Sequence, residues 1–166
     1  MEVDFLAPKE IKLKATKPKT IENFRVLQAD GCDAAFRDPE VIEIDGPMIS
    51  GATNRVTVRV AAIPDFVLMK CFALQNRDKP KDAYDIVYCL EHFRDAGPMI
   101  AAAWRDERLR TLVRDATKIL REKFSGVRSF GPQQVVVFHN ARSVQERDQQ
   151  ARDAYERVQQ FLALLS

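Results

Sequence analysis

The chain has 166 residues, which is enough for one domain with a single buried core. Its 26 lysines and arginines nearly balance 24 acidic residues, so the net charge of +2 excludes a general attraction to nucleic acid, and any basic site has to be local. Hydrophobic residues make up 46% and charged residues 30% of the chain, a composition that excludes disorder over most of its length.

Membrane insertion and structural cysteine chemistry are also excluded. No apolar run reaches the roughly 18 residues that cross a bilayer, and residues 1–14 contain no signal-peptide core. We therefore expect a cytoplasmic protein. The odd set of Cys32, Cys71 and Cys89 has no CxxC spacing, which argues against disulfides and a zinc site.

The first third of the chain has strand patterns. We predict short strands at residues 1–7 and 11–15, the first ended by Pro8, followed by a basic loop at 16–20. The lysines of 9–19 are read as a solvated strand and loop, with contact to nucleic-acid phosphates as the alternative. Residues 21–36 are mixed, with a strand beginning near Phe24 and a helical turn before Phe36.

Two clear strands follow at residues 41–45 and 55–61, where β-branched and polar residues alternate between glycine-containing turns. An antiparallel hairpin is predicted. Alternation places Val56, Val58 and Val60 toward the core. The opposite face then carries Arg55, Thr57 and Arg59.

Helical periodicity begins at Pro64 and predicts helices at residues 64–76 and 80–93, the second closed by Gly97 and Pro98. The apolar stripe of the second helix consists of Ala83, Ile86, Val87, Leu90 and Phe93.

A short apolar stretch at 99–104 precedes a third predicted helix at 106–123. Residues 133–138 are ambiguous, with extended structure favoured over a helical turn. Ser143 and Glu146 form a capping-box pattern that opens a final amphipathic helix.

These elements predict an α+β fold, in which a small mixed or antiparallel sheet is followed by a C-terminal helical bundle. A β-rich part at residues 1–63 and a helical part at 64–166 are expected to pack as one unit, because no Gly/Ser-rich linker separates them.

Charged residues gather where the two helices of residues 63–93 meet. Lys70 and Arg77 lie seven residues apart on one helix face, and Asp82 and Asp85 are neighbours on the next helix. The short connection brings Arg77, with Lys79 and Lys81, close to Asp82. Surface ion pairs explain most of this pattern, but a lysine at 70, inside an almost wholly apolar helix, requires a buried partner or an exit to solvent.

The run Lys70-x6-Arg77-x-Lys79-x-Lys81-Asp82-x2-Asp85 resembles the lysine motif and the following (R/K)D-x-x-D motif of AbiEii-type nucleotidyltransferases. This family includes toxins of abortive-infection and toxin–antitoxin systems. The order of elements is also similar: a strand at residues 2–8, a hairpin, a helix starting at IPDF, two charged helices and a helical C-terminus.

The resemblance implies roles for particular residues. Lys70 corresponds to the lysine that meets nucleotide phosphate, and Asp82 and Asp85 correspond to the acidic motif. Arg77 and Lys81 complete the nucleotide-binding set. Asp4 fits the third metal-binding carboxylate of the sheet, with an exposed strand-edge acid as the alternative.

The family's Gly-Ser motif and its Asp-x-Asp pair do not occur in the sequence. Two-metal phosphoryl transfer requires such carboxylates. We therefore expect the chain to resemble the later part of the enzyme, transferring NMP from an NTP with Mg²⁺ to a protein or RNA acceptor when the missing motif is supplied. The alternative is a catalytically inactive module that binds a partner chain, such as an antitoxin or the missing N-terminal half, or that forms a homo-oligomer.

Overall fold

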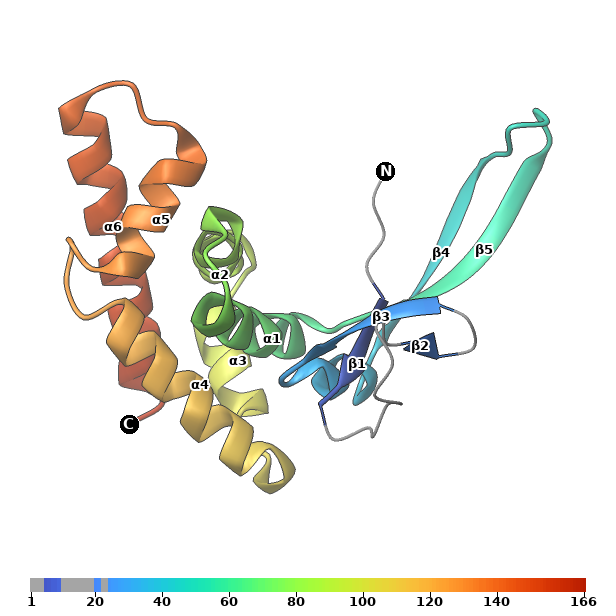
Figure 1. The fold of residues 1–166 in the computed structure, drawn as a ribbon, viewed down its shortest axis with the longest axis horizontal. Helices are drawn as coiled ribbons and strands as arrows, with labels where there is room; N and C mark the ends of the chain where they lie inside the picture. The colour runs from blue at the N-terminus through green and yellow to red at the C-terminus, as the bar shows by residue number, and fades with distance from the viewer. Residues whose placement is uncertain (1–4, 10–19, 22–23) are drawn as a thin grey trace.

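The described part of the protein is α+β, with strands in the first part and helices from residue 63 onward (Figure 1). A computed structural model describes residues 5–9, 20–21 and 24–166. The predicted fold class is confirmed. Asp4, the predicted strand at 11–15 and residues 16–19 of the predicted loop lie outside the described residues.

A three-stranded sheet lies beside the helical part. β3 (Phe24–Ala29) is central, with β1 (Phe5–Pro8) parallel to it on one edge and β2 (Thr20–Ile21) antiparallel on the other. Ala7 and Val26 are buried, whereas Leu6 and Leu27 are about half exposed. This alternation is the period of two expected of a strand with one covered face.

The chain leaves β3 through a sharp turn at Gly31, which has a φ of 69°. A Cβ atom at this position would lie 2.7 Å from the ring of Phe72, so only glycine fits both the backbone conformation and the contact. The turn starts η1 (Cys32–Phe36), the helical segment that packs on α1.

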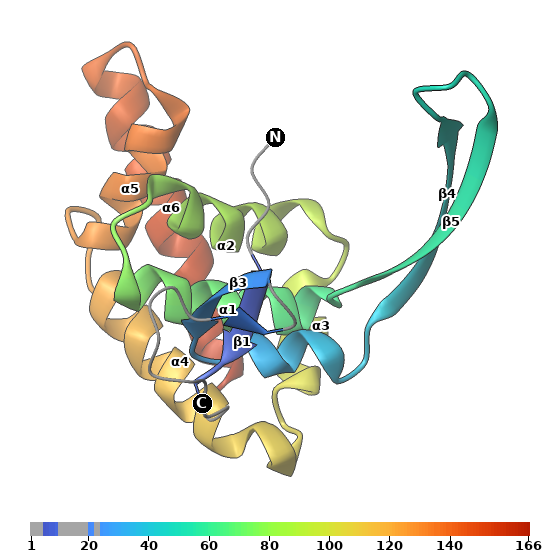
Figure 2. The same ribbon diagram turned by 45° about the vertical axis from the view of Figure 1, so that its right-hand side comes forward.

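The predicted hairpin is present as β4 (Glu40–Pro47) and β5 (Thr53–Val60), in antiparallel register with Glu43 opposite Thr57. The prediction that its valines face the core is wrong. Val56 and Val60 are 44% and 43% exposed. The reason is that the hairpin extends away from the rest of the described chain, so its apolar face has no element packed over it (Figures 1 and 2).

Six α-helices and one short 3-10 helix form the rest of the described chain. They are α1 (Ile63–Asn76), α2 (Pro80–His92), α3 (Ala96–Ala103), η2 (Glu107–Leu109), α4 (Arg110–Lys123), α5 (Phe130–His139) and α6 (Val144–Leu164). None of the helices in the described ranges combines the length and apolar character needed to cross a bilayer.

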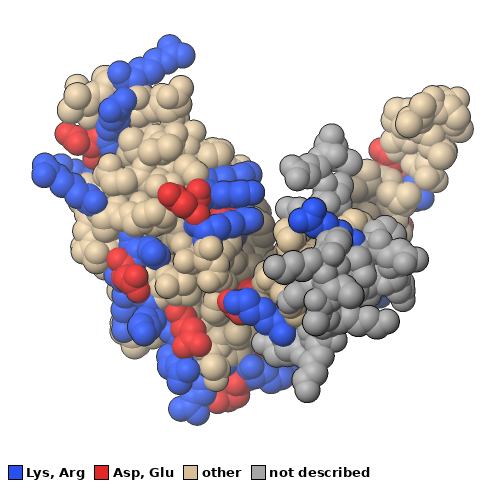
Figure 3. Space-filling view, viewed as in Figure 1, with Lys and Arg blue, Asp and Glu red and all other residues tan. Residues whose placement is uncertain are grey.

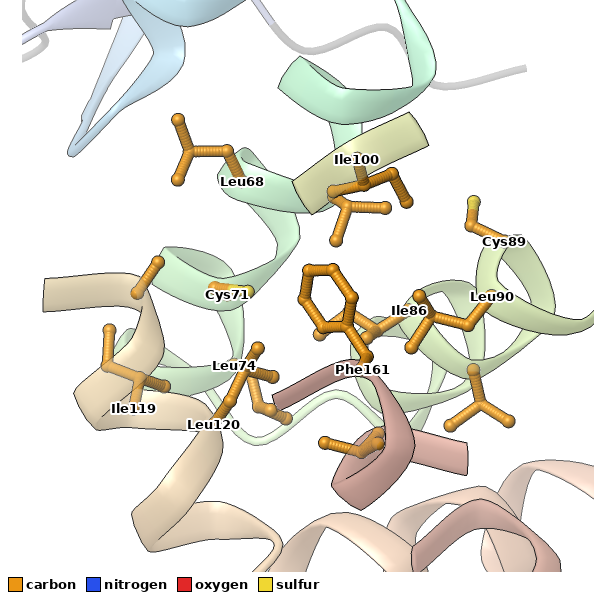
Figure 4. Close-up of a cluster of buried hydrophobic side chains, with 14 of the residues drawn as sticks. Leu68, Cys71, Leu74, Ile86, Cys89, Leu90, Ile100, Ile119, Leu120 and Phe161 are labelled. Atoms are coloured by element: carbon orange, nitrogen blue, oxygen red, sulfur yellow. The ribbon is translucent and has the colours of Figure 1, made fainter. Parts of the chain in front are cut away.

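The main core lies between α1, α2, α3, α4 and α6. Phe161 of α6 points among the side chains of α1, α2 and α3 (Figure 4). Its ring meets that of Trp104 edge-on, with 5.3 Å between centroids. Leu68 and Leu120 are fully buried in the same cluster. This core holds α1 and α2 side by side, which fixes the charged joint between them.

Three helix predictions are corrected. Gly97 and Pro98 do not close α2; they lie in the first turn of α3, where proline's missing N–H needs no partner. Residues 133–138 are helical in α5, because Val135 and Val136 pack against neighbouring helices. Phe93 is 41% exposed just after the end of α2, so the buried stripe stops at Leu90.

Candidate functional site

The candidate site is built where α1 passes into α2. Residues 77–79 connect the helices, and Pro80 occupies the first turn of α2, which places Asp82 in that turn. The first turn favours a carboxylate because the helix dipole is positive there. The short connection therefore presents a buried acid directly to the last two turns of α1.

Asp82 is held by two cations, Lys70 of α1 and Arg77, which directly follows α1. Lys70 Nζ donates to its Oδ1 at 2.9 Å, and Arg77 donates from Nε to Oδ2 at 2.6 Å and from Nη2 to Oδ1 at 2.9 Å. Two parallel bonds from one guanidinium fix the carboxylate in plane as well as in position.

Asp85 continues the same network one turn later. Lys70 Nζ lies 2.7 Å from its Oδ2, and Lys81 Nζ donates to Oδ1 at 2.6 Å and to Oδ2 at 2.9 Å. Lys70 therefore bridges both carboxylates, which is the buried partner that the sequence required. The geometry brings together Lys70, Arg77, Lys81, Asp82 and Asp85.

The network keeps Asp82 ionised although its side chain is only 1% exposed. Burial raises the pKa of this carboxyl, but the hydrogen bonds and charges of Arg77 and Lys70 outweigh burial, so the pKa is lowered below its usual 3.8. Three cations face two carboxylates, which leaves one positive charge in excess.

Lys70 and Arg77 also line a cavity of about 410 Å³ between α1 and the three-stranded sheet. The cavity has apolar walls from both elements, including Leu6, Leu27 and Met69. Lys70 Nζ lies 5.3 Å from the centre of the Phe66 ring, a cation–π distance at the same wall.

A second cluster of polar side chains, formed by Asn76, Asp30 and Lys9, borders the cavity beside Arg77. Asn76 Nδ2 donates to Asp30 Oδ2 at 3.2 Å, and Lys9 pairs with the same carboxylate oxygen. A cavity of this size, with apolar walls and a few convergent polar groups, is typical of a small-molecule site.

A sequence model of the family described as "Nucleotidyl transferase AbiEii toxin, Type IV TA system" matches residues 31–163. The chain belongs to this family. The AbiEii resemblance predicted from the motif of residues 70–85 is thereby confirmed. No curated protein and no solved structure matches the chain.

The described residues of this AbiEii chain do not form a metal site. All four carboxylate oxygens of Asp82 and Asp85 already accept hydrogen bonds or ion pairs from Lys70, Arg77 or Lys81. Within the described ranges, no group of three His, Cys, Asp or Glu side chains is placed to hold an ion. Mg²⁺ therefore does not fit this half of the site, and Asp4, the predicted metal ligand, lies outside the described residues.

A second buried acid in this AbiEii chain was not predicted as part of a cluster. Asp65, in the first turn of α1, is 1% exposed and accepts from Arg37 Nη2 at 2.8 Å, while Arg37 Nη1 reaches Asp106 at 3.0 Å. Burial raises the pKa of Asp65, even though Arg37 opposes the shift. Sequence spacing gives no signal for contacts across 28 and 69 residues.

Cys32, Cys71 and Cys89 are free and buried. Burial raises the pKa of the Cys71 thiol, and burial, assisted by Asp85, raises that of Cys89 to about 11. Both thiols stay protonated at neutral pH and are poor nucleophiles.

Proposed function

We propose that this AbiEii family member binds a nucleoside triphosphate in the cavity between the sheet and α1. Lys70 and Arg77 would meet the phosphates, since both side chains line the cavity and their network carries excess positive charge. The observation that carries the proposal is Lys70, which is held by two buried carboxylates at the cavity wall.

The apolar walls would hold the base and sugar, because the side chains of Leu6, Leu27 and Met69 provide apolar contact area and contain no polar groups that need hydrogen-bond partners. Lys81, which pairs with Asp85 and is more exposed, would add positive charge outside the cavity. Asp82 and Asp85 would be positioning residues that hold the cations and do not touch the nucleotide.

In the proposed reaction an oxygen of a protein or RNA acceptor bonds to the α-phosphorus of the triphosphate, the bond from that phosphorus to the α–β bridging oxygen breaks, and pyrophosphate leaves as NMP is transferred. Mg²⁺ would supply charge neutralisation and alignment of the phosphates when bound. Its carboxylate ligands would come from Asp4 and from an Asp-x-Asp pair that this sequence does not contain. The chain's own contribution is to bind and orient the triphosphate with Lys70 and Arg77.

The test is calorimetric titration of the chain and its Lys70→Met variant with ATP and GTP. Lys70→Met is expected to fold, because Arg77 still pairs with Asp82 and Lys81 with Asp85. We expect nucleotide affinity to fall at least about tenfold, a loss of roughly 1.4 kcal/mol.

Lys79→Met is the matched control, since Lys79 lies in the same joint and makes no ion pair with the described residues. It should bind nucleotide like the parent. Equal affinity in the parent and Lys70→Met would refute the site assignment.

A second function is favoured by the exposed hairpin. Its apolar face carries Ile42, Ile44 and Val56, which are 41%, 49% and 44% exposed, and an isolated two-stranded ribbon is marginally stable in water. We infer as the alternative that this face binds a partner chain, either an antitoxin, an N-terminal half or a second copy. In that case the chain is a catalytically inactive interaction module.

A further inference from the structure

A second cavity, of about 760 Å³, lies between α3, η2, α4 and the end of α6. Figure 1 places α4 on the side of α1 away from the three-stranded sheet, and the two cavities share no lining residue, so this groove is separate from the cavity beside Lys70. Its walls contain five basic side chains: Arg105, Arg110, Arg114, Lys118 and Arg121.

Four of these cations share one face of α4. Arg110, Arg114 and Lys118 follow one another at four-residue steps, with Arg121 three residues further on. Each four-residue step advances about 6 Å along a helix, so the charges form a row along the groove. Figure 3 shows lysine and arginine side chains along α4, with fewer acidic ones between them.

Few ion pairs with the described residues neutralise this row of cations. Arg105, Lys118 and Arg121 make no ion pair with any described residue. Arg110 pairs with Glu107 at 3.7 Å and Arg114 with Asp115 at 3.2 Å, both on exposed side chains where such pairs contribute little.

The acids of the groove are fewer and partly occupied. Asp106 already accepts from Arg37 at 3.0 Å and from Arg108 at 2.7 Å, so its charge is compensated outside the row. Glu107 is the other acid in the lining. Five cations against two acids concentrate positive charge here in a chain whose net charge is only +2.

The composition fits phosphate better than a protein surface. The buried centre of a protein–protein interface is depleted of charged residues, whereas half of the residues in this lining are charged. Four of the five cations are arginines, whose planar guanidinium binds phosphate through two donors.

We infer that this groove holds the sugar–phosphate backbone of a single nucleic-acid strand. The inference rests on the proposed function, because it selects RNA over protein as the acceptor of the transferred nucleotide. A basic groove is the kind of local site that the nearly balanced composition of the chain allows. The groove contributes affinity without base readout, because its contacts are to phosphate.

The test is fluorescence anisotropy of a labelled single-stranded RNA of mixed sequence, titrated with the full chain at several salt concentrations. The triple variant Arg114→Gln, Lys118→Gln, Arg121→Gln is compared with the parent. We expect at least about tenfold weaker binding, and a slope of log affinity against log salt that is shallower by about 2, since each phosphate contact contributes roughly 0.7.

The matched control is Arg128→Gln, Arg142→Gln, Arg152→Gln, which removes the same charge from exposed side chains outside the groove and without ion pairs to described residues. This control should bind RNA like the parent, and circular dichroism should show both triple variants folded. Equal weakening by the two variants would overturn the groove assignment, because it would reflect net charge alone.

Competitors identify the ligand. Unlabelled RNA, single-stranded DNA and polyglutamate are each titrated against the bound labelled RNA. Displacement of the labelled RNA at a lower concentration of unlabelled RNA than of DNA or polyglutamate supports the inference. Tighter binding of DNA would overturn RNA as the source of the strand, and equally tight binding of polyglutamate would assign the groove to an acidic protein. ATP titration of the same parent sample tests the nucleotide site separately, so failure of one proposal is distinguishable from failure of the other.

Discussion

Lys70 shows how one residue organises the joint. Its amino group lies between two carboxylates of α2, with Asp82 at 2.9 Å and Asp85 at 2.7 Å, and its side chain is 16% exposed. Removing Lys70, Asp82 and Asp85 from water costs free energy, which the network offsets only through close pairing of these charges. Such an arrangement specifies the position of Lys70 more than it stabilises the fold, which is what a phosphate-binding group requires.

At this scale we predict the effect of Asp82→Asn on stability. The variant should lose about 3 kcal/mol in the free energy of unfolding at neutral pH, because Arg77 and Lys70 lose a buried charged partner. The pKa of Asp82 is lowered in the folded state, so its stabilisation is present above the unfolded-state value of 3.8 and is lost as the pH falls through the folded value.

Urea unfolding from pH 7 downward measures this difference. The gap between the parent and Asp82→Asn should stay constant at neutral pH and narrow below about pH 3.8. Asp78→Asn, an exposed acid in the same connection, should change stability by less than about 0.5 kcal/mol. A gap that does not depend on pH would show that the ion pairs are not its cause.

At the scale of elements, each helix owes its boundaries to local signals and its position to packing. The predicted capping box at the start of α6 is present in part: Ser143 Oγ accepts from Glu146 N at 3.1 Å, while the Glu146 carboxylate accepts from Arg142 N at 2.9 Å. From this start α6 buries Ala154, Val158 and other residues against α2, α3, α4 and α5.

We expect Ser143→Ala to lower the free energy of unfolding by about 1 kcal/mol, since one backbone donor of the first turn of α6 loses its acceptor. Thermal or urea unfolding followed by circular dichroism provides the measurement. Ser125→Ala, at an exposed serine outside the helices, is the control and should be neutral. A neutral Ser143→Ala would mean that packing alone defines the start of α6.

At the scale of the molecule, the hairpin is the element with no cover in the described chain. Its register places Ile42 opposite Val58 and Ile44 opposite Val56 on one face, while Thr57 and its polar neighbours occupy the other. An exposed apolar face of this kind marks an interaction surface.

We predict that the chain self-associates through this face, giving a light-scattering mass above the monomer value of 18.9 kDa. Ile44→Lys should restore the monomer by placing a charge on the apolar face. Thr57→Lys makes a comparable change on the opposite face and should leave the association intact. A parent that stays monomeric over a wide concentration range would contradict self-association through the hairpin.

Much of the helical part was predictable from sequence because helix signals are local. The stripe from Ala83 to Leu90, the pairing of Arg77 with Asp82 and the start of α6 each depend on residues within a few positions of one another. The sequence also identified the residues of the joint, since a lysine at 70 inside an apolar helix required a partner. The division into residues 1–63 and 64–166, and the roles of the site residues, stay predictions.

Only the tertiary structure decided which elements pack against each other. The alternation of β5 predicts which side chains share a face, but only the path of the hairpin decides that this face meets no other element. Likewise Arg37 reaches Asp65, and the α4 cations border a groove, through packing between segments far apart in the chain. The periodicity of a sequence reflects the geometry of a single helix or strand, whereas the burial of a residue depends on all the elements packed around it. The sequence by itself therefore determined the charged joint, and the tertiary structure decided which cavity the joint faces.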